Sequence, residues 1–193
     1  MTTESHDVPV DEATPALGAV VESDRGSLPF ELIHGEALVA CASWALGDAG
    51  VTAIDLTVTW SGVIDTGEPF VLHDALCPMT PATFIADCVA RAVDEDRVVV
   101  GVRPVTDTVK VVEGGLVGAT VDRAQLWSVA SPVVLPVSVV AELDGPPTRD
   151  FATLVDLLRR DHDVELVEAP AIARRVDSLD DVRLLEALTT PPV

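Results

Sequence analysis

The sequence contains no tyrosine and few other aromatic residues, four phenylalanines and three tryptophans. Valine, leucine and alanine therefore have to fill most of any hydrophobic core. The three cysteines, Cys41, Cys77 and Cys88, form neither a CxxC pair nor a zinc-binding spacing, and no pair of histidines has metal-ligand spacing. These absences argue against a disulfide-stabilised fold and a metal site, and they favour a reduced, cytoplasmic protein.

A long apolar run is also missing. The longest, residues 126–140, carries two prolines and is too short to span a bilayer. Residues 1–15 are acidic and rich in threonine, the opposite of a basic and then apolar signal peptide. We therefore expect no membrane association and a cytoplasmic location.

Positive charge is scarce as well. Lysine and arginine total 12 against 32 aspartates and glutamates, so the formal net charge is -20. Residues 1–90 contain a single cation, Arg25, and Lys110 is the only lysine in the chain. Such a chain repels nucleic-acid backbones and anionic membranes, so we expect no nucleic-acid partner. A bound polyphosphate has to draw on cations after residue 90, on backbone amides or on Mg²⁺.

With 193 residues, 48% of them hydrophobic and 23% charged, the chain has the size and composition of one packed domain. We predict a mobile acidic tail over residues 1–16 and a single domain over residues 17–190. Apolar runs predict strands at residues 17–21, 53–60, 70–72, 97–102 and 164–167. Helices are predicted at residues 37–46, 81–93, 151–160 and 178–187, with Thr80 and Ser178 as N-caps of the second and the last.

Strands that alternate with helices favour an α/β sheet with helices on both faces. Residues 108–112 and 116–121 flank a Glu-Gly-Gly turn and predict a hairpin, which interrupts this alternation and is expected to project as an arm. In such sheets ligands bind beyond the carboxyl ends of the strands. We therefore expect a site at His73-Asp74, at Arg103 and along residues 106–110.

Each candidate side chain also has a purely structural interpretation. Asp74 either meets a polar ligand or caps the turn after its strand. Lys110 either completes a polar site with residues 106–108 or is an isolated lysine. Arg174-Arg175 is either a solvated pair or an anion contact. The remaining candidates are given structural roles: a local ion pair for Asp122 and Arg123, structural or surface positions for His34 and His162, and a small buried apolar role for Cys77.

Several short motifs, taken in order, resemble those of one family. Residues 73–78, HDALCP, resemble an HDAARP motif, and residues 107–110, DTVK, resemble a DTIK motif. Residues 122–127, DRAQLW, resemble DRxxLW, and residues 131–132, SP, stand at a TPQ motif. Residues 173–177, ARRVD, resemble NIKVT, and residues 30–38 resemble part of KxFxxLxGxPLL. These motifs are those of the methylerythritol-phosphate cytidylyltransferases, and the resemblance extends over about residues 17–187.

This resemblance implies a Rossmann-like, GT-A-like nucleotidyltransferase fold with a β arm at about residues 103–129 that exchanges across a homodimer. It implies transfer of CMP from CTP to methylerythritol phosphate with Mg²⁺, in isoprenoid precursor synthesis. On the acceptor side it implies that Asp74 holds hydroxyl groups and that Thr108 and Arg123 reach across from the partner's arm. It also implies that Ser131 and Arg175 bind substrate in place of a threonine and a lysine.

The nucleotide side departs from the family pattern. Residues 22–30, ESDRGSLPF, replace the AAGxGxR loop and put two carboxylates where phosphates need backbone amides. Leu28 stands at the position of the catalytic lysine. Only eight residues separate Trp60 from Pro69, where the family has a helix, a strand and its cytosine-binding GGxxRxxSV motif. Cys77 replaces the arginine of HDAARP, which removes a contact to the acceptor.

Two functional hypotheses follow. The first is a degenerate family member, a pseudoenzyme without a cofactor that binds a partner protein or a small sugar phosphate. The alternative is an active cytidylyltransferase with a rearranged loop, in which Arg25 clamps the phosphates of CTP and Mg²⁺ accompanies the nucleotide. The charge distribution favours the first, because each carboxylate near a triphosphate costs on the order of 1 kcal/mol in a partly screened site.

Overall fold

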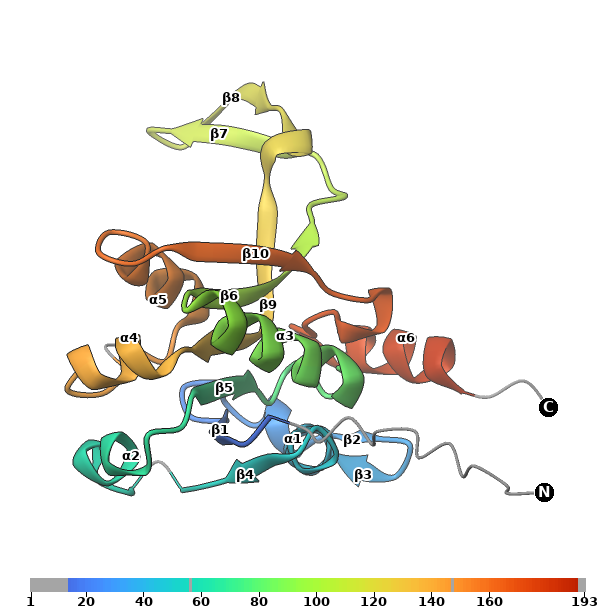
Figure 1. Cartoon of the computed structure of the whole chain (residues 1–193). Coiled ribbons are helices and arrows are strands. Elements are labelled where there is room, and N and C mark those ends of the chain that lie inside the picture. Colours follow the sequence, from blue (N-terminus) through green and yellow to red (C-terminus); the bar gives the residue numbers. More distant parts are fainter. Residues whose placement is uncertain (1–13, 56, 147, 191–193) are drawn as a thin grey trace, which may run out of the picture.

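The computed structural model describes residues 14–55, 57–146 and 148–190 (Figure 1). Its centre is a six-stranded sheet in the order β10-β6-β9-β5-β1-β4. Strands β1 (Ala16–Val21), β4 (Val51–Ala53) and β5 (Phe70–Asp74) are parallel to one another. Strands β6 (Val98–Pro104) and β10 (Val164–Glu168) are also parallel, and β9 (Trp127–Leu135) lies antiparallel between β5 and β6. The predicted α/β sheet is confirmed.

Helices cover both faces of the sheet, as expected. Successive side chains of a strand point to opposite faces. Phe70 and Leu72 therefore pack into the cluster that holds α2 (Trp60–Thr66), α4 (Val137–Glu142) and α5 (Phe151–Leu158). Val71 packs on the other face with α1 (Leu38–Asp48) and α3 (Ala82–Glu95).

A third, smaller cluster fixes the turn that follows β5. It joins Leu76 and Val176 to Leu185 of α6 (Leu179–Thr189) and to Ile33 of the short ribbon β2 (Leu32–Ile33) and β3 (Glu36–Ala37). Ser178 caps α6 as predicted, since its Oγ accepts a hydrogen bond from the backbone N–H of Asp181. Short helical turns lie at η1 (Leu28–Phe30), η2 (Arg123–Gln125) and η3 (Ala171–Ala173). The cluster places the residues before α6 beside the carboxyl end of β5.

The predicted hairpin is present and stands away from the main sheet (Figure 1). Strands β7 (Val109–Glu113) and β8 (Leu116–Val121) pair only with each other. Below them β6 and β9 pair as far as Pro104 and Trp127. The arm therefore consists of residues 105–126, on a root of two paired strands.

Two sequence predictions are wrong. The strand expected at residues 53–60 ends at Ala53, after which the Asp55 side chain accepts the backbone N–H of Thr57 at 2.8 Å and α2 begins at Trp60. This helix occupies the shortened segment, and in the described part of that segment no strand lies between β4 and β5. Thr80 is not the N-cap of α3, since Pro81 takes that position and the Thr80 hydroxyl donates to the carbonyl of Cys77.

The predicted acidic tail lies almost wholly outside the described residues, and its last residue, Ala16, already begins β1. Within the ranges that the structure describes, the helices are all too short or too polar to cross a membrane.

Candidate ligand-binding site

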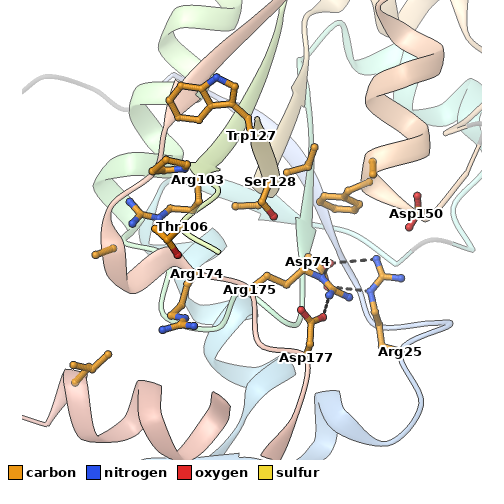
Figure 2. Close-up of a pocket in the computed structure, with 17 residues that line it drawn as sticks. Arg25, Asp74, Arg103, Thr106, Trp127, Ser128, Asp150, Arg174, Arg175 and Asp177 are labelled. Carbon is orange, nitrogen blue, oxygen red and sulfur yellow. Dashed lines mark hydrogen bonds and ion pairs between the residues drawn. The ribbon is translucent and has the colours of Figure 1, made fainter. Parts of the chain in front are cut away.

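Asp74 is the centre of a buried polar network at the carboxyl end of β5 (Figure 2). Its side chain is 2% exposed. Oδ1 accepts hydrogen bonds from Arg25 Nε at 3.1 Å and from the backbone N–H of Leu76 at 3.0 Å. Oδ2 accepts from Arg25 Nη2 at 3.3 Å and from Arg175 Nε at 3.2 Å. A carboxylate has about four acceptor positions, so a ligand meets Asp74 only by displacing one of these donors.

Arg25 is held from three sides. Besides the two bonds to Asp74, its Nη2 donates to the carbonyl of Arg149 at 2.8 Å, and its guanidinium carbon lies 6.0 Å from the ring centre of Phe151. Arg149 in turn donates from Nη1 to Ser23 Oγ at 2.9 Å. The loop after β1 and the segment before α5 are thus joined by two crossed arginines, and the Arg25 side chain is only 7% exposed.

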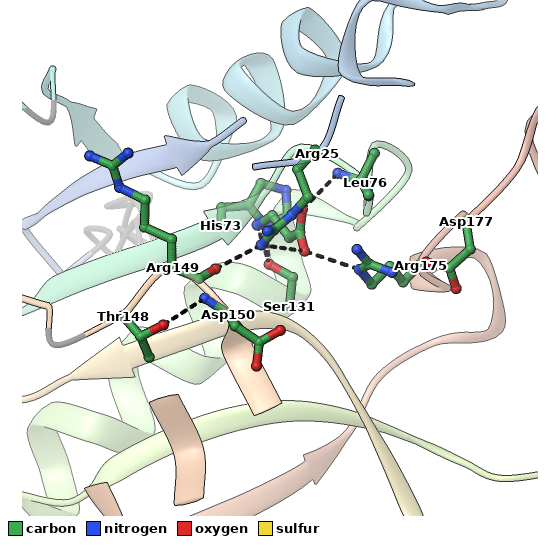
Figure 3. A network of polar contacts seen from close by, with 10 residues as sticks. Arg25, His73, Leu76, Ser131, Thr148, Arg149, Asp150, Arg175 and Asp177 are labelled. Atoms are coloured by element: carbon green, nitrogen blue, oxygen red, sulfur yellow. Dashed lines mark hydrogen bonds and ion pairs between the residues drawn. The ribbon is translucent and has the colours of Figure 1, made fainter. Parts of the chain in front are cut away.

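Ser131 and His73 lie beneath this network, fully buried (Figure 3). Ser131 Oγ accepts the backbone N–H of Asp74 at 3.0 Å and lies 2.5 Å from Nδ1 of His73. Burial lowers the pKa of His73 to about 4, against a smaller upward effect of the Asp74 carboxylate. Ser131 was expected to bind substrate, but its hydroxyl does not line the pocket and instead fixes the backbone of Asp74.

A pocket of about 640 Å³ opens in front of Asp74 (Figure 2). It reaches from the loop after β1 to the root of the arm and the segment before α6. Its charged lining residues are four arginines and three aspartates: Arg25, Arg103, Arg174, Arg175, Asp74, Asp150 and Asp177. In a chain with a net charge of -20, this local excess of positive charge marks the pocket as a place for an anion.

A second depression, of about 400 Å³, lies where the family resemblance puts the nucleotide. Its lining carries two carboxylates, Glu22 and Asp55, and one guanidinium, Arg149, which already donates to Ser23. In the described ranges, no three histidine, cysteine, aspartate or glutamate side chains converge as they would around a metal ion. The side chains of this lining therefore offer a triphosphate little positive charge of their own.

The structure brings together only part of the predicted site. Asp74 and Arg175 meet, and Arg25 joins them. Thr108 and Arg123 lie on the arm and do not line the pocket of their own chain. Arg123 donates to the carbonyl of Thr106, and Asp122, the acid expected to pair with it, instead caps η2 through the backbone N–H of Ala124.

Cys77 and His34 have the structural roles expected of them, and Lys110, for which two roles were open, stands apart from the pocket. The Cys77 side chain is fully buried, and burial raises the pKa of its thiol. His34 joins the β2–β3 turn to α6, with its Nε2 2.7 Å from the Thr189 hydroxyl. Lys110 donates to Thr120 across the hairpin, away from the pocket. Sequence reasoning missed Trp127 and Ser128 as pocket residues, because strand β9, which carries them, was not predicted.

The parallel strands, the antiparallel β9, the projecting hairpin and the pocket at the strand ends define a nucleotidyltransferase-like α/β protein. The sequence model of the 2-C-methyl-D-erythritol 4-phosphate cytidylyltransferases matches residues 51–188. The chain therefore belongs to this family.

Individual relatives agree with this assignment. The 2-C-methyl-D-erythritol 4-phosphate cytidylyltransferase of Nocardia farcinica is 34% identical over 122 residues, 62% of this chain and 52% of the relative. That of Corynebacterium diphtheriae is 33% identical over 105 residues, 54% of this chain and 38% of the relative. The chain spans about half the length of the curated relatives it matches.

Solved structures of the family share the fold. The crystal structure of the Thermus thermophilus cytidylyltransferase superposes with a TM-score of 0.65 at 24% identity, over 89% of this chain and 96% of that one. A 4-diphosphocytidyl-2C-methyl-D-erythritol synthase superposes with a TM-score of 0.69 at 16% identity, over 93% and 100% of the two chains. The expected nucleotidyltransferase fold is confirmed.

Proposed function

We propose that this chain is a non-transferring member of the cytidylyltransferase family that binds a small phosphorylated polyol. The position of Arg25 carries this proposal. The first ninety residues contain no other cation, so Arg25 is their one candidate for a phosphate clamp. Its guanidinium is instead committed to Asp74 and to the carbonyl of Arg149. Freeing it from a buried carboxylate costs several kcal/mol.

The residues on the nucleotide side do not compensate for this cost. Glu22 and Asp55 line the depression there, and the Arg149 guanidinium that faces them is bonded to Ser23. A triphosphate brought to this place meets carboxylates rather than donors, which raises its free energy of binding. The acceptor side keeps a positively charged pocket with hydroxyl groups of Thr106 and Ser128 in its lining, as a phosphorylated polyol requires.

The test is pyrophosphate release from CTP with Mg²⁺ and 2-C-methyl-D-erythritol 4-phosphate, with the Nocardia farcinica relative run in parallel as positive control. We expect release no faster than in a blank without protein. In a thermal-shift titration, the sugar phosphate alone should raise Tm, since a ligand at a hundred times its Kd stabilises the fold by about 2.7 kcal/mol. If pyrophosphate release exceeds that of the blank and this excess is lost in Arg25→Gln, the proposal is wrong and the protein is an active enzyme.

We also infer that the arm joins two copies of this chain. Its strands expose Val112, Leu116 and Val117 at 64%, 77% and 72%. Exchange would cover these side chains and would carry Thr108 and Arg123 to the partner's pocket, which they do not reach in their own chain. Light scattering should give twice the 20.3 kDa mass of one chain. Leu116→Glu should weaken the dimer and Leu184→Glu, the same change at an exposed helix position, should not; a monomeric wild type contradicts the inference.

A further inference from the structure

The positive charge of the pocket is not evenly compensated. Arg25 and Arg175 face Asp74, and Arg175 also pairs with Asp177. Arg103 has only a distant carboxylate, Glu168 at 3.7 Å, whose side chain is 58% exposed. Within the described part of the chain no carboxylate lies within 4.0 Å of the Arg174 guanidinium. Arg103 and Arg174 are therefore the least compensated cations in the described lining of the pocket.

Arg103 and Arg174 are distant in the sequence and share one side of the pocket. Figure 2 shows them with Thr106 on the side away from Arg25 and Asp150. Arg103 ends β6 and is held in place because its Nη1 donates to the carbonyl of Ala169 at 2.6 Å. Arg174 follows η3 directly and is half-buried. The Arg103 guanidinium is thus held by the fold, and Arg174 enters the pocket lining as a half-buried residue.

Trp127 forms the adjoining wall. The residue is 45% exposed although it begins a strand of the main sheet, where it pairs with Pro104. A half-exposed tryptophan on the same side of the pocket as Arg103 (Figure 2) offers an apolar face next to a phosphate-binding charge. That combination suits a ligand with a carbon skeleton at one end and a phosphate at the other.

We propose that Arg103 and Arg174 bind the phosphate of the ligand and that its carbon skeleton lies against Trp127. The choice of a phosphorylated polyol rests on the proposed function, whereas the anion site itself rests only on the pocket. Arg174 stands where the family motif NIKVT has an isoleucine, and Arg103 lies outside the motifs. This phosphate site therefore does not follow from the family motifs.

The experiment compares wild type, Arg174→Gln, Arg103→Gln and Trp127→Leu, with Arg160→Gln as matched control. Arg160 is exposed after α5, outside the pocket, and its replacement makes the same change in net charge. Inorganic phosphate and 2-C-methyl-D-erythritol 4-phosphate are titrated separately at low salt by calorimetry. Circular dichroism first establishes that each variant is folded. If loss of the bond to Ala169 unfolds Arg103→Gln, the comparison of wild type with Arg174→Gln is sufficient to test the phosphate site.

Loss of a charge-assisted hydrogen bond should raise the Kd of Arg174→Gln about ten- to a hundredfold for both ligands. Trp127→Leu should weaken binding of the sugar phosphate and leave inorganic phosphate unchanged. Both affinities should fall with added salt.

Three results would overturn the inference: no binding of inorganic phosphate to the wild type, equal binding to Arg174→Gln, or an equal loss in Arg160→Gln. None of these depends on nucleotide transfer, so the proposed function succeeds or fails by its own assay. If CMP is transferred and Arg174→Gln still weakens phosphate binding, only the proposed function is refuted. If the sugar phosphate binds wild type and Arg174→Gln with the same Kd, only this phosphate site is refuted.

Discussion

Lowering the pH from 7 to 5 should destabilise this protein through His73. The imidazole is fully buried, and burial lowers its pKa from 6.5 to about 4 in the folded state, with Asp74 acting weakly in the opposite direction. In the unfolded chain the same group takes up its proton near pH 6.5. Between these values the unfolded state binds more protons, so stability falls as the pH falls through this window, and it falls no further once both states are protonated below about pH 4.

The magnitude follows from the two pKa values. At pH 5 the unfolded state gains about thirtyfold in statistical weight relative to the folded state, which corresponds to about 2 kcal/mol. The structure explains why the proton is excluded. The ring lies 2.5 Å from Ser131 Oγ through Nδ1, and its buried Nε2 has no protein partner in the described residues, so an imidazolium, which carries an N–H on both nitrogens, leaves its Nε2–H without an acceptor. A loss of 2 kcal/mol is large for a domain with a total of about 5–15 kcal/mol.

The assay is urea denaturation at pH 7 and pH 5 of the wild type and of His73→Asn. An asparagine side-chain amide can form a hydrogen bond with the Ser131 hydroxyl in place of Nδ1, but it does not titrate. The free energy of unfolding should fall by about 2 kcal/mol more in the wild type than in the variant, since the other titrating groups contribute equally to both. His34→Asn is the control for removing an exposed histidine. An equal pH dependence in wild type and His73→Asn, within about 0.5 kcal/mol, would refute this account.

Two further substitutions test the network and the sheet. Arg25→Ala should lower the free energy of unfolding by about 1–3 kcal/mol, less than for a fully broken buried pair because a second arginine still faces Asp74, and urea denaturation at pH 7 measures it; an unchanged midpoint would show that the pair contributes nothing. Gly101→Ala places a Cβ 2.5 Å from the carbonyl oxygen of Ser131 and should cost more than about 2 kcal/mol, because β6 and β9 must separate. The control is Gly47→Ala in α1, whose added Cβ meets no atom within 4 Å and which should be neutral or stabilising by up to about 1 kcal/mol. Thermal melts of both glycine variants measure the difference.

The apolar runs at residues 70–72 and 97–102 predicted the buried strands β5 and β6 correctly, and the Glu-Gly-Gly turn predicted the exposed hairpin. Strand β9 escaped prediction because Pro132 lies within its run, and a proline argues against a central strand. The pairing shows how it is accommodated. The ladder to β6 passes from Val133 directly to Val129, so Pro132 falls in an irregularity where no N–H is needed. The alternation of Val and Thr over residues 53–60 predicted a strand that ends at its first residue, because Asp55 turns the chain by a local hydrogen bond.

The rule that ligands bind beyond the carboxyl ends of strands led to Asp74 and Arg103, both of which line the pocket, and the family resemblance added Arg175. The motifs led to Asp74 and Arg175, which do meet. The contact between Arg25 and Asp74 joins residues 49 positions apart, and Arg103 and Arg174 approach one pocket from 71 positions apart. No local pattern encodes such a meeting, because only the packing of β1, β5 and β6 in one sheet brings their carboxyl ends together.

The commitment of Arg25 bears directly on which ligand this fold can accept. A nucleotide that recruits Arg25 must first remove it from Asp74, and the free energy of that step, several kcal/mol for a buried pair, is subtracted from binding. The same nucleotide then meets Glu22 and Asp55, and repulsion from each adds on the order of 1 kcal/mol in a partly screened site. A phosphate at Arg174 breaks no ion pair within the described part of the chain, so only desolvation and ordering of the two groups oppose its binding. This difference in cost is the physical basis of the proposed preference for a single phosphate over a triphosphate.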